Sequence, residues 1–243
     1  MKLIGLIGFP LKHSFSNKFF TDKFIDEHLS QFSHQNFELK SIDELPLLML
    51  SHPELFGFNI TIPYKEQVLP YLQSIDEAAA KIGAVNCVKV NRQSGINLKG
   101  YNTDWLGFWQ SIKSHIEPHH QSALILGNGG SSKAVQYALS INGISFQVVS
   151  RRGALTYADL TEEIIRNHLL IINTTPLGMF PAVDVYPPIP YEGIGSQHLC
   201  YDLIYNPAET VFLTKCRLQG AAIKNGYDML HIQAEESWRI WNS

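Results

Sequence analysis

The 243-residue sequence lacks long apolar runs and any excess of basic residues. A helix that crosses a bilayer needs about 20 consecutive apolar residues, and no stretch approaches that length. The 19 Lys and Arg residues stand against 22 Asp and Glu, a formal net charge of -3. That balance leaves no basic surplus for a phosphate backbone. We therefore expect small-molecule ligands, with neither nucleic acid nor a membrane as partner.

Cysteine is also scarce. Cys87, Cys200 and Cys216 are odd in number and lack the spacing of a metal-ligand set, so we expect no metal site. They fit reduced thiols in a cytoplasm better than a disulfide framework. The apolar stretch Leu3–Phe9 follows one lysine, but Pro10-Leu11-Lys12-His13 stands where a signal peptide would carry small residues for cleavage. We expect a buried first strand there and a cytoplasmic protein.

Short apolar runs alternate with stretches of helical period from end to end. This alternation predicts the α/β class, with parallel strands connected by helices. We expect an α/β domain over residues 1–103 and a second α/β series from residue 104 on. The expected strands are Leu3–Ile7, Phe37–Lys40, Phe58–Ile62, Ala84–Val90, Ile96–Lys99, Ala123–Leu126, Ser145–Val149, Leu169–Asn173, Leu199–Ile204 and Ala221–Lys224.

A glycine-rich turn in the second half follows a predicted strand and opens a predicted helix. Its sequence is Gly127-Asn128-Gly129-Gly130-Ser131-Ser132, with Ser132 in place of the third glycine of the usual fingerprint. Glycines let the backbone approach a pyrophosphate, and free N–H groups at a helix start meet its charge. An ordinary turn is the alternative, but the strand–turn–helix context favours dinucleotide binding.

The end of the next strand indicates which dinucleotide is bound. An NAD site normally places Asp or Glu there for the ribose hydroxyls, whereas this chain has Ser150-Arg151-Arg152. Guanidinium groups suit a 2'-phosphate through charge and forked hydrogen bonds, so the sequence favours NADP. Two solvated surface arginines are the alternative.

Polar residues of the predicted strand Phe58–Ile62 share one face. Asn59 and Thr61 alternate with apolar neighbours. Pro63 suits the first turn of a helix, which places Lys65 near a helix N-terminus, where the macrodipole disfavours a cation. Lys65 is then either a solvated surface residue or a catalytic group with a lowered pKa.

Four further residues have both a structural and a functional interpretation. Ser14 and Ser16 could cap the first helix or hold a substrate carboxylate. Asn86 lies inside an apolar strand, where a buried amide needs partners. Asp104 could be a plain helix cap or a carboxylate of the active site.

Eight ordered segments together carry a resemblance to a known family. They are Gly8–Ser16, Asn59–Lys65, Gly83–Asn86, Gly100–Asp104, Gly127–Gly130, Asn173–Met179, Tyr205–Pro207 and Gly226–Ala234. From the first strand to the last helix, the chain resembles the shikimate dehydrogenases. That resemblance implies NADP-linked interconversion of 3-dehydroshikimate and shikimate, a step toward aromatic amino acids, in a monomer or homodimer. It also implies an N-terminal α/β substrate domain over residues 1–103, a Rossmann-type NADP domain over 104–225, and a last helix over 226–243 that returns to the first domain.

The resemblance also implies residue roles. Ser14 and Ser16 would bind the substrate carboxylate, and Lys65 and Asp104 would form the catalytic pair. The rest of the substrate site would comprise Thr61, Asn86, Asp104, Tyr205 and Gln233. The cofactor site would comprise Gly127, Asn128, Gly129, Gly130, Ser131, Ser150, Arg151, Arg152, Asn173, Thr174, Thr175, Met179 and Gly226.

Two other functions share most of these motifs. One is a relaxed quinate/shikimate dehydrogenase that uses NAD or NADP, and Arg151 with Arg152 argues against an NAD preference. The other is a catalytically silent NADP-binding regulatory protein on the same fold. Lys65 and Asp104 argue against it, because a sensor needs no proton-transfer pair.

Overall fold

The structure, a computed structural model, describes residues 1–11 and 15–243 and divides the chain into two compact units. Unit 1 comprises Met1–Thr103 with Ala234–Ser243, and unit 2 comprises Asp104–Gln233. The second division falls inside the last helix, α8 (Tyr227–Asn242). Its first turns belong to unit 2 because Met229 is buried in that unit's core.

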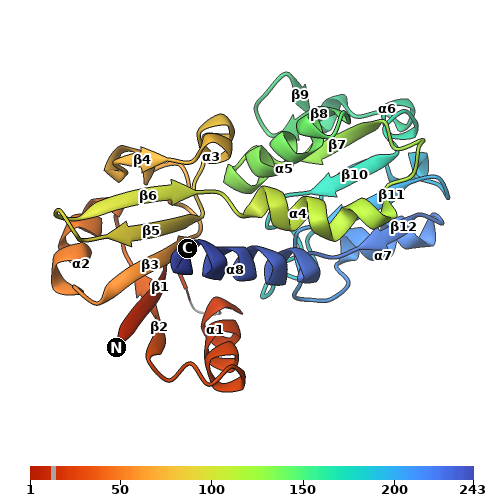
Figure 1. The fold of residues 1–243 in the computed structure, drawn as a ribbon. Coiled ribbons are helices and arrows are strands. Elements are labelled where there is room, and N and C mark those ends of the chain that lie inside the picture. The colour runs from red at the N-terminus through yellow and green to blue at the C-terminus, as the bar shows by residue number, and fades with distance from the viewer. Residues whose placement is uncertain (12–14) are drawn as a thin grey trace. The chain divides into compact units, whose positions relative to one another are not determined.

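Unit 1 is built on a mixed six-stranded sheet with the order β2-β1-β3-β5-β6-β4 (Figure 1). β1 lies between β2 and β3 and is parallel to both, whereas β5 is antiparallel to its neighbours β3 and β6. The elements are β1 (Lys2–Gly8), α1 (Phe15–Asp26), β2 (Phe32–Glu38), α2 (Leu45–Ser51), β3 (Leu55–Ile60), β4 (Ser74–Ile75), α3 (Glu77–Ile82), β5 (Cys87–Asn91) and β6 (Asn97–Tyr101).

Each face of this sheet buries its own apolar cluster. On one face Phe58 and Ile60 pack in a cluster with residues of α2 and α3. On the other face Ile4 packs with Phe20 of α1 and Trp241 of α8. The alternation predicted along β3 is confirmed for Phe58 and Ile60. Ile62 is 61% exposed because the strand has ended before it.

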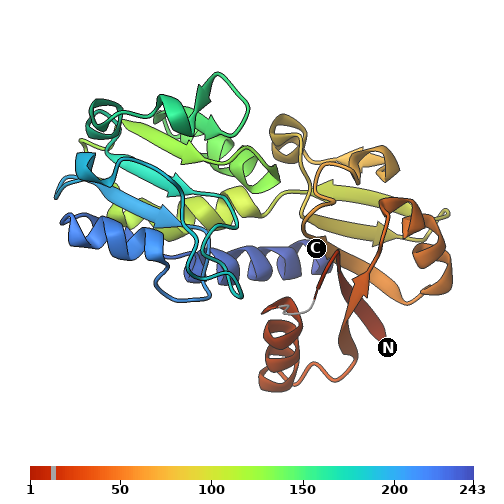
Figure 2. The same cartoon turned by 180° about the vertical axis from the view of Figure 1, so that it is seen from behind.

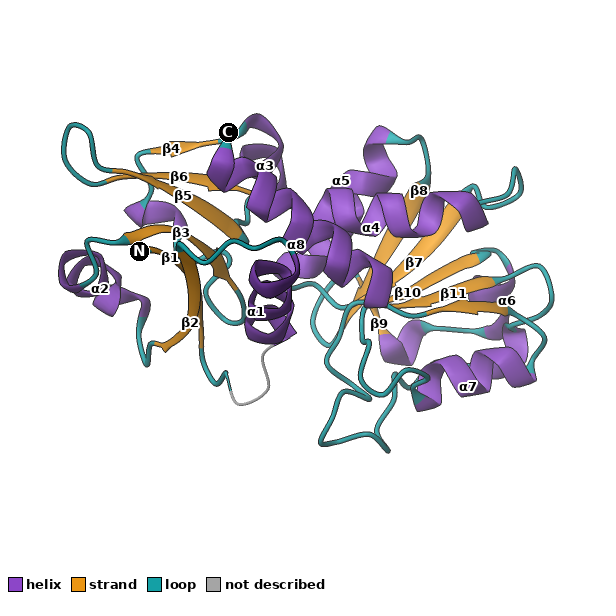
Figure 3. Ribbon diagram, turned by 60° about the horizontal axis from the view of Figure 1, so that its bottom comes forward, coloured by secondary structure: helices purple, strands orange, loops and turns teal. Residues whose placement is uncertain are grey.

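Unit 2 has a fully parallel six-stranded sheet with the order β12-β11-β10-β7-β8-β9. Helices cover both faces of this sheet (Figure 3), which is the Rossmann-type arrangement that the sequence predicted. The elements are α4 (Asp104–Ile112), β7 (Ser122–Leu126), α5 (Gly130–Ile141), β8 (Ser145–Ser150), β9 (Leu155–Thr156), α6 (Glu162–Arg166), β10 (Leu170–Asn173), β11 (Leu199–Asp202), α7 (Val211–Leu218), β12 (Ala222–Lys224) and the start of α8.

Successive residues of the central strands enter different cores, as the two-residue period of a strand requires. Ala123 and Ile125 of β7 pack in a cluster with residues of α4 and α5. Leu124 and Leu126 pack in a second cluster with residues of α6 and α7. Burial on both faces explains why these strands appear in the sequence as continuous apolar runs.

The helix predicted after Pro63 is wrong. Residues 62–68 form consecutive turns, followed by a short 3-10 helix over Leu69–Tyr71. The Lys65 carbonyl accepts from the Val85 amide at 2.8 Å, and the Leu69 amide bonds to Glu66. Because the Lys65 carbonyl is engaged by another part of the chain, the helical ladder does not propagate. Lys65 therefore does not lie at the N-terminus of a helix, where a helix dipole would act on it.

Candidate active site

The predicted substrate residues of unit 1 begin at the carboxyl ends of β1 and β3. A Cβ atom on Gly8 would lie 2.4 Å from Thr61 Cγ2, so only glycine permits this approach. The Thr61 amide donates to Ile7 (2.9 Å), and the Phe9 amide donates to Ile62 (3.1 Å). The segment that leaves β1 is therefore fixed beside Thr61.

That segment leads to the two predicted carboxylate-binding serines. Ser14 lies outside the described residues. Ser16 is in the first turn of α1 and is partly buried. Its predicted role stays a prediction, as does that of Ser14.

A buried amide residue connects β3 to the segment that follows β6. Asn86, just before β5, is 3% exposed. Its Oδ1 accepts from the Thr103 amide at 2.7 Å, and its Nδ2 donates to Thr103 Oγ1 at 2.9 Å. The backbone carbonyl of Asn86 accepts from the Ile60 amide at 2.8 Å. These bonds hold Thr103 directly ahead of Asp104, which is 5% exposed and begins α4 in unit 2.

Two further residues belong to this buried network, although the sequence did not identify them as site residues. Asn59 Nδ2 donates to Ser237 Oγ at 2.9 Å and to the Asn86 carbonyl at 3.0 Å. Asn59 Oδ1 is buried and has no partner among the described residues. The alternation along β3 had placed Asn59 on the polar face beside Thr61. Ser237 gave no signal, because a serine inside an amphipathic helix is ordinary.

The remaining predicted substrate residues lie in separate segments. Lys65 is partly buried in the turns that follow β3. Gln233, on α8, is 8% exposed and its Nε2 donates to the Leu230 carbonyl at 2.9 Å. Tyr205 follows β11, and burial raises the pKa of its phenol. The phenol is therefore a neutral hydrogen-bonding group at physiological pH.

In unit 2 the glycine-rich turn joins β7 to α5. Gly127 has φ of +111°, and a Cβ there would lie 2.6 Å from Thr174 Oγ1. Gly129 precedes α5, and a Cβ there would meet nothing within 4 Å. Ser132, in place of the third glycine, is fully buried and donates to the Gly127 carbonyl at 2.7 Å. The turn is thus packed beneath Gly127 and open above Gly129.

A cavity of about 450 Å³ adjoins this turn, lined by Asn128, Arg151 and Arg152. Both arginines are exposed, and neither guanidinium has an ion-pair partner in the part of the chain that the structure describes. The Ser150 hydroxyl donates to the Arg152 carbonyl at 2.9 Å and so shapes the turn that carries them. An open pocket with two unpaired guanidiniums can bind a phosphate.

The segment after β10 forms a hydrogen-bonded turn at the same end of the sheet (Figure 2). Asn173 Oδ1 accepts from the Thr175 amide at 3.0 Å and from its hydroxyl at 2.6 Å. Thr174 Oγ1 donates to the Leu126 carbonyl at 2.7 Å, next to the glycine-rich turn. Met179, at the end of this turn, is 45% exposed.

Gly226 lies where the chain enters α8. A Cβ there would lie 2.1 Å from the Leu203 carbonyl oxygen. The glycine therefore allows the chain to pass closely over the segment that follows β11.

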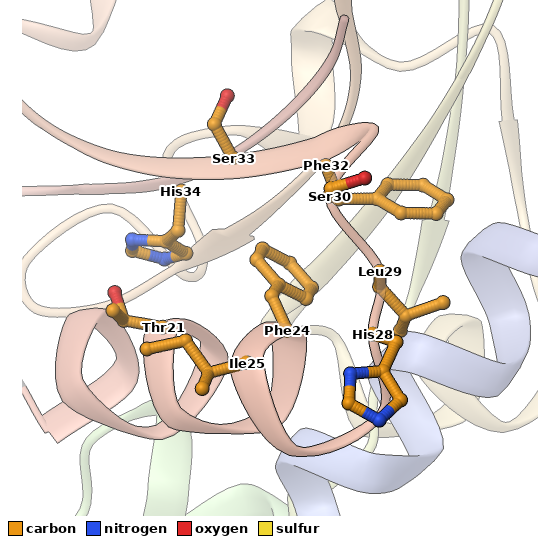
Figure 4. Close-up of a pocket in the computed structure, with 9 residues that line it drawn as sticks. All are labelled: Thr21, Phe24, Ile25, His28, Leu29, Ser30, Phe32, Ser33 and His34. Carbon is orange, nitrogen blue, oxygen red and sulfur yellow. The ribbon is translucent and has the colours of Figure 1, made fainter.

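A second hollow, of about 660 Å³, lies between α1 and β2 in unit 1 (Figure 4). None of the predicted site residues lines it. His34 is one of its lining residues, and neither ring nitrogen has a hydrogen-bond partner among the described residues. Burial lowers the pKa of His34 to about 4.

Within residues 1–11 and 15–243, no group of three or more His, Cys, Asp or Glu residues could hold a metal ion. Within the same ranges, no helix is both long and apolar enough to span a bilayer.

Comparison with known proteins gives matches along nearly the whole chain. Residues 6–88 match the shikimate dehydrogenase substrate binding domain. A shikimate dehydrogenase (NADP(+)) of Caldanaerobacter subterraneus subsp. tengcongensis is 38% identical, over 99% of this chain and 91% of that protein. The crystal structure of shikimate dehydrogenase from Aquifex aeolicus superposes with a TM-score of 0.85 at 34% identity, covering 100% of this chain and 92% of that one. The Thermus thermophilus enzyme in complex with NADP(H) and shikimate gives a TM-score of 0.84 at 29% identity, covering 99% and 93%.

Proposed function

The chain belongs to the shikimate dehydrogenase family, and we propose that it catalyses the reversible NADP-dependent reduction of 3-dehydroshikimate to shikimate in aromatic amino acid biosynthesis. The observation that carries the proposal is the open glycine turn beside an arginine-lined pocket, in a chain similar to NADP-dependent relatives along its full length.

The residues of unit 2 fit NADP. Arg151 and Arg152, assisted by Asn128, would hold the 2'-phosphate, and the open space above Gly129 would admit the pyrophosphate. Ser131 would contribute at the start of α5, and Ser150 would hold the arginine turn. Asn173, Thr174, Thr175, Met179 and Gly226 would border the nicotinamide end. When bound, NADP supplies or accepts the hydride.

Seven residues would bind shikimate. Ser14 and Ser16 would donate to the carboxylate. Thr61 and Asn86 would orient the ring hydroxyls, since both are fixed by short hydrogen bonds. Asp104, Tyr205 and Gln233 would complete the site. In this assignment residues 1–103 form the substrate domain, residues 104–225 form the cofactor domain, and the last helix serves the substrate domain.

Lys65 would exchange the proton on the oxygen that becomes the shikimate hydroxyl. Asp104 would be its partner: a carboxylate near an ammonium favours the charged form and orients it. General acid-base catalysis of this kind contributes about 10² to 10⁴ in rate. The protein thus positions the substrate and exchanges one proton at this oxygen.

Steady-state rates with shikimate and quinate, each with NADP⁺ and NAD⁺, test this proposal. We expect shikimate with NADP⁺ to give the highest kcat/KM. Comparable rates with quinate would favour the relaxed dehydrogenase instead. No turnover with any of the four pairs, together with tight NADP⁺ binding, would favour the silent regulatory protein. We also propose a cytoplasmic monomer or homodimer.

A further inference from the structure

Asp202 is a buried carboxylate at the end of β11 that none of the roles above uses. It is 0% exposed, and it faces Asn173 in the parallel register between β11 and β10. A buried acid without a cation is costly unless donors surround it. Asp202 forms no ion pair within the described residues.

Three donors from two segments converge on this carboxylate. Asn173 Nδ2 donates to Oδ1 at 3.1 Å, and the Ile204 amide donates to the same oxygen at 3.0 Å. The Thr210 hydroxyl donates to Oδ2 at 2.6 Å. Thr210 also accepts from the Leu213 amide at 3.3 Å and thereby caps α7. Three donors suit the ionised form of the carboxylate, which only accepts hydrogen bonds.

These bonds set the orientation of the Asn173 amide. With its Nδ2 held by Asp202, its Oδ1 faces the Thr175 amide and hydroxyl. A direct backbone bond, from the Phe180 amide to the Asn206 carbonyl at 3.1 Å, ties the same two segments together. Asp202 therefore links the turn after β10 to the segment after β11, which carries Tyr205.

We infer that Asp202 is a positioning residue: its ionised carboxylate fixes the turn of residues 173–179 and the segment of residues 203–210 in the arrangement that binds the nicotinamide half of NADP. The inference rests on the proposed function. Protonation of Asp202 would place an O–H among three donors and remove the charge that strengthens their bonds. Protonation would therefore loosen the attachment between these two segments.

Burial raises the pKa of Asp202 to about 6, although the three hydrogen bonds lower it. The carboxylate can therefore be titrated between pH 5 and pH 8. Two titratable groups interact electrostatically with Asp202, the phenols of Tyr191 and Tyr201. Burial raises the pKa of both phenols above the ordinary value. Both therefore stay neutral between pH 5 and pH 8, and neither adds a second titration there.

The test compares two ligands in Asp202→Asn. NADP⁺ carries the nicotinamide half, whereas adenosine 2',5'-bisphosphate lacks it and would occupy only the adenosine end, beside Asn128, Arg151 and Arg152. We expect the Kd of NADP⁺ to rise about tenfold or more, since bonds to a charged group are lost, with the Kd of the bisphosphate within about twofold of wild type. As the pH drops from 7 to 5, the affinity ratio of NADP⁺ to bisphosphate should fall in wild type relative to the variant. The ratio cancels the titration of the 2'-phosphate, and the comparison with the variant cancels that of the bisphosphate's 5'-phosphate, whose second pKa is about 6.

Thr210 supplies matched variants in case Asp202→Asn does not fold. Thr210→Val removes the hydroxyl and should reproduce the selective loss of NADP⁺ affinity, while Thr210→Ser should behave as wild type. Equal affinities in wild type and Asp202→Asn, or equal losses for both ligands, would overturn the inference. If wild type bound neither ligand, the proposed function itself would fail, which is a distinct result.

Discussion

Asn86 and Thr103 are joined by three hydrogen bonds, two between their side chains and one from the Thr103 amide to Asn86 Oδ1. The Thr103 hydroxyl also lies 3.3 Å from Ser237 Oγ. Because Thr103 directly precedes Asp104, this arrangement fixes the residue ahead of the proposed catalytic carboxylate.

Thr103→Val should therefore weaken both stability and turnover. The substitution keeps the shape and removes the hydroxyl, so Asn86 Nδ2 loses a buried acceptor at a cost of about 1–3 kcal/mol. We expect lower kcat/KM for shikimate and an unchanged Kd for NADP⁺, measured beside urea unfolding. Thr103→Ser keeps the hydroxyl and is the control. A valine variant with wild-type kcat/KM would show that the network serves only the fold.

Arg151→Ala tests the choice of cofactor. Removing one guanidinium from the pocket should raise the KM for NADP⁺ about 10- to 100-fold, in line with the roughly 1.5–3 kcal/mol of a charge-assisted hydrogen bond. NAD⁺ lacks the 2'-phosphate, so its constants should change little. Arg152→Ala in parallel shows whether the second arginine contributes. Equal losses with both cofactors would mean that Arg151 supports the fold and does not read the phosphate.

Alanine should have different effects at the two glycines of the turn, lowering stability at Gly127 and NADP⁺ affinity at Gly129. Gly127→Ala must place a Cβ against Thr174 at a positive φ, so it should cost at least about 1–3 kcal/mol of stability. Gly129 has φ of -80° and open space around it. Gly129→Ala should unfold like wild type and still bind NADP⁺ about tenfold more weakly, because its methyl group occupies the pyrophosphate position. Thermal unfolding and NADP⁺ titration separate the two effects. An unchanged Kd in Gly129→Ala would place the pyrophosphate elsewhere.

His34→Phe should remove an acid-sensitive term in stability. The ring stacks on Phe20 with centroids 5.4 Å apart, a contact that phenylalanine keeps. Burial lowers the pKa of His34 from 6.5 to about 4. The unfolded chain thus takes up a proton first as the pH falls, and folding loses about 3 kcal/mol between pH 7 and pH 3.5.

The measurement is the free energy of unfolding against pH. The wild-type curve should fall below that of His34→Phe as the pH drops through this window. His115→Gln, at an exposed histidine, should follow wild type. Parallel curves for wild type and His34→Phe would show that the His34 nitrogens are not desolvated as described.

Sequence periodicity located the central strands of unit 2 well, because they are buried on both faces and hence uniformly apolar. It failed at β2, where Phe32–Glu38 carries Ser33, His34, Gln35 and Asn36 in succession. β2 is an edge strand, so its polar residues face less core and give no alternating signal. The short strand β9 was missed for a similar reason.

At the candidate site, too, the sequence predicted local features and missed those that depend on distant residues. The glycines and the two arginines predicted a cofactor-binding turn from local sequence alone. Asp202 was not identified, because its importance depends on donors from Asn173 and Thr210 on other elements. The turn at Lys65 was misassigned because a long-range bond to Val85 decides it. Local patterns cannot report such contacts.

Lys65→Met separates a catalytic lysine from a binding one. A group that exchanges the proton in the transition state should, when removed, lower kcat by at least about 10²-fold while KM moves little. Lys65 is only partly buried, so the variant should fold. Asp104→Asn should also slow turnover, because the proposal makes Asp104 the group that orients the lysine.

The double variant gives the decisive comparison. Two residues that act as one unit lose most of their effect at the first substitution, so the second should add much less than its own single-variant penalty. Rates for wild type, both single variants and the double variant, all at saturating NADP⁺ and shikimate, complete the cycle. Strictly multiplicative losses would mean that Lys65 and Asp104 act separately. Full kcat in Lys65→Met with only a raised KM would leave Lys65 as a binding residue and require another proton donor.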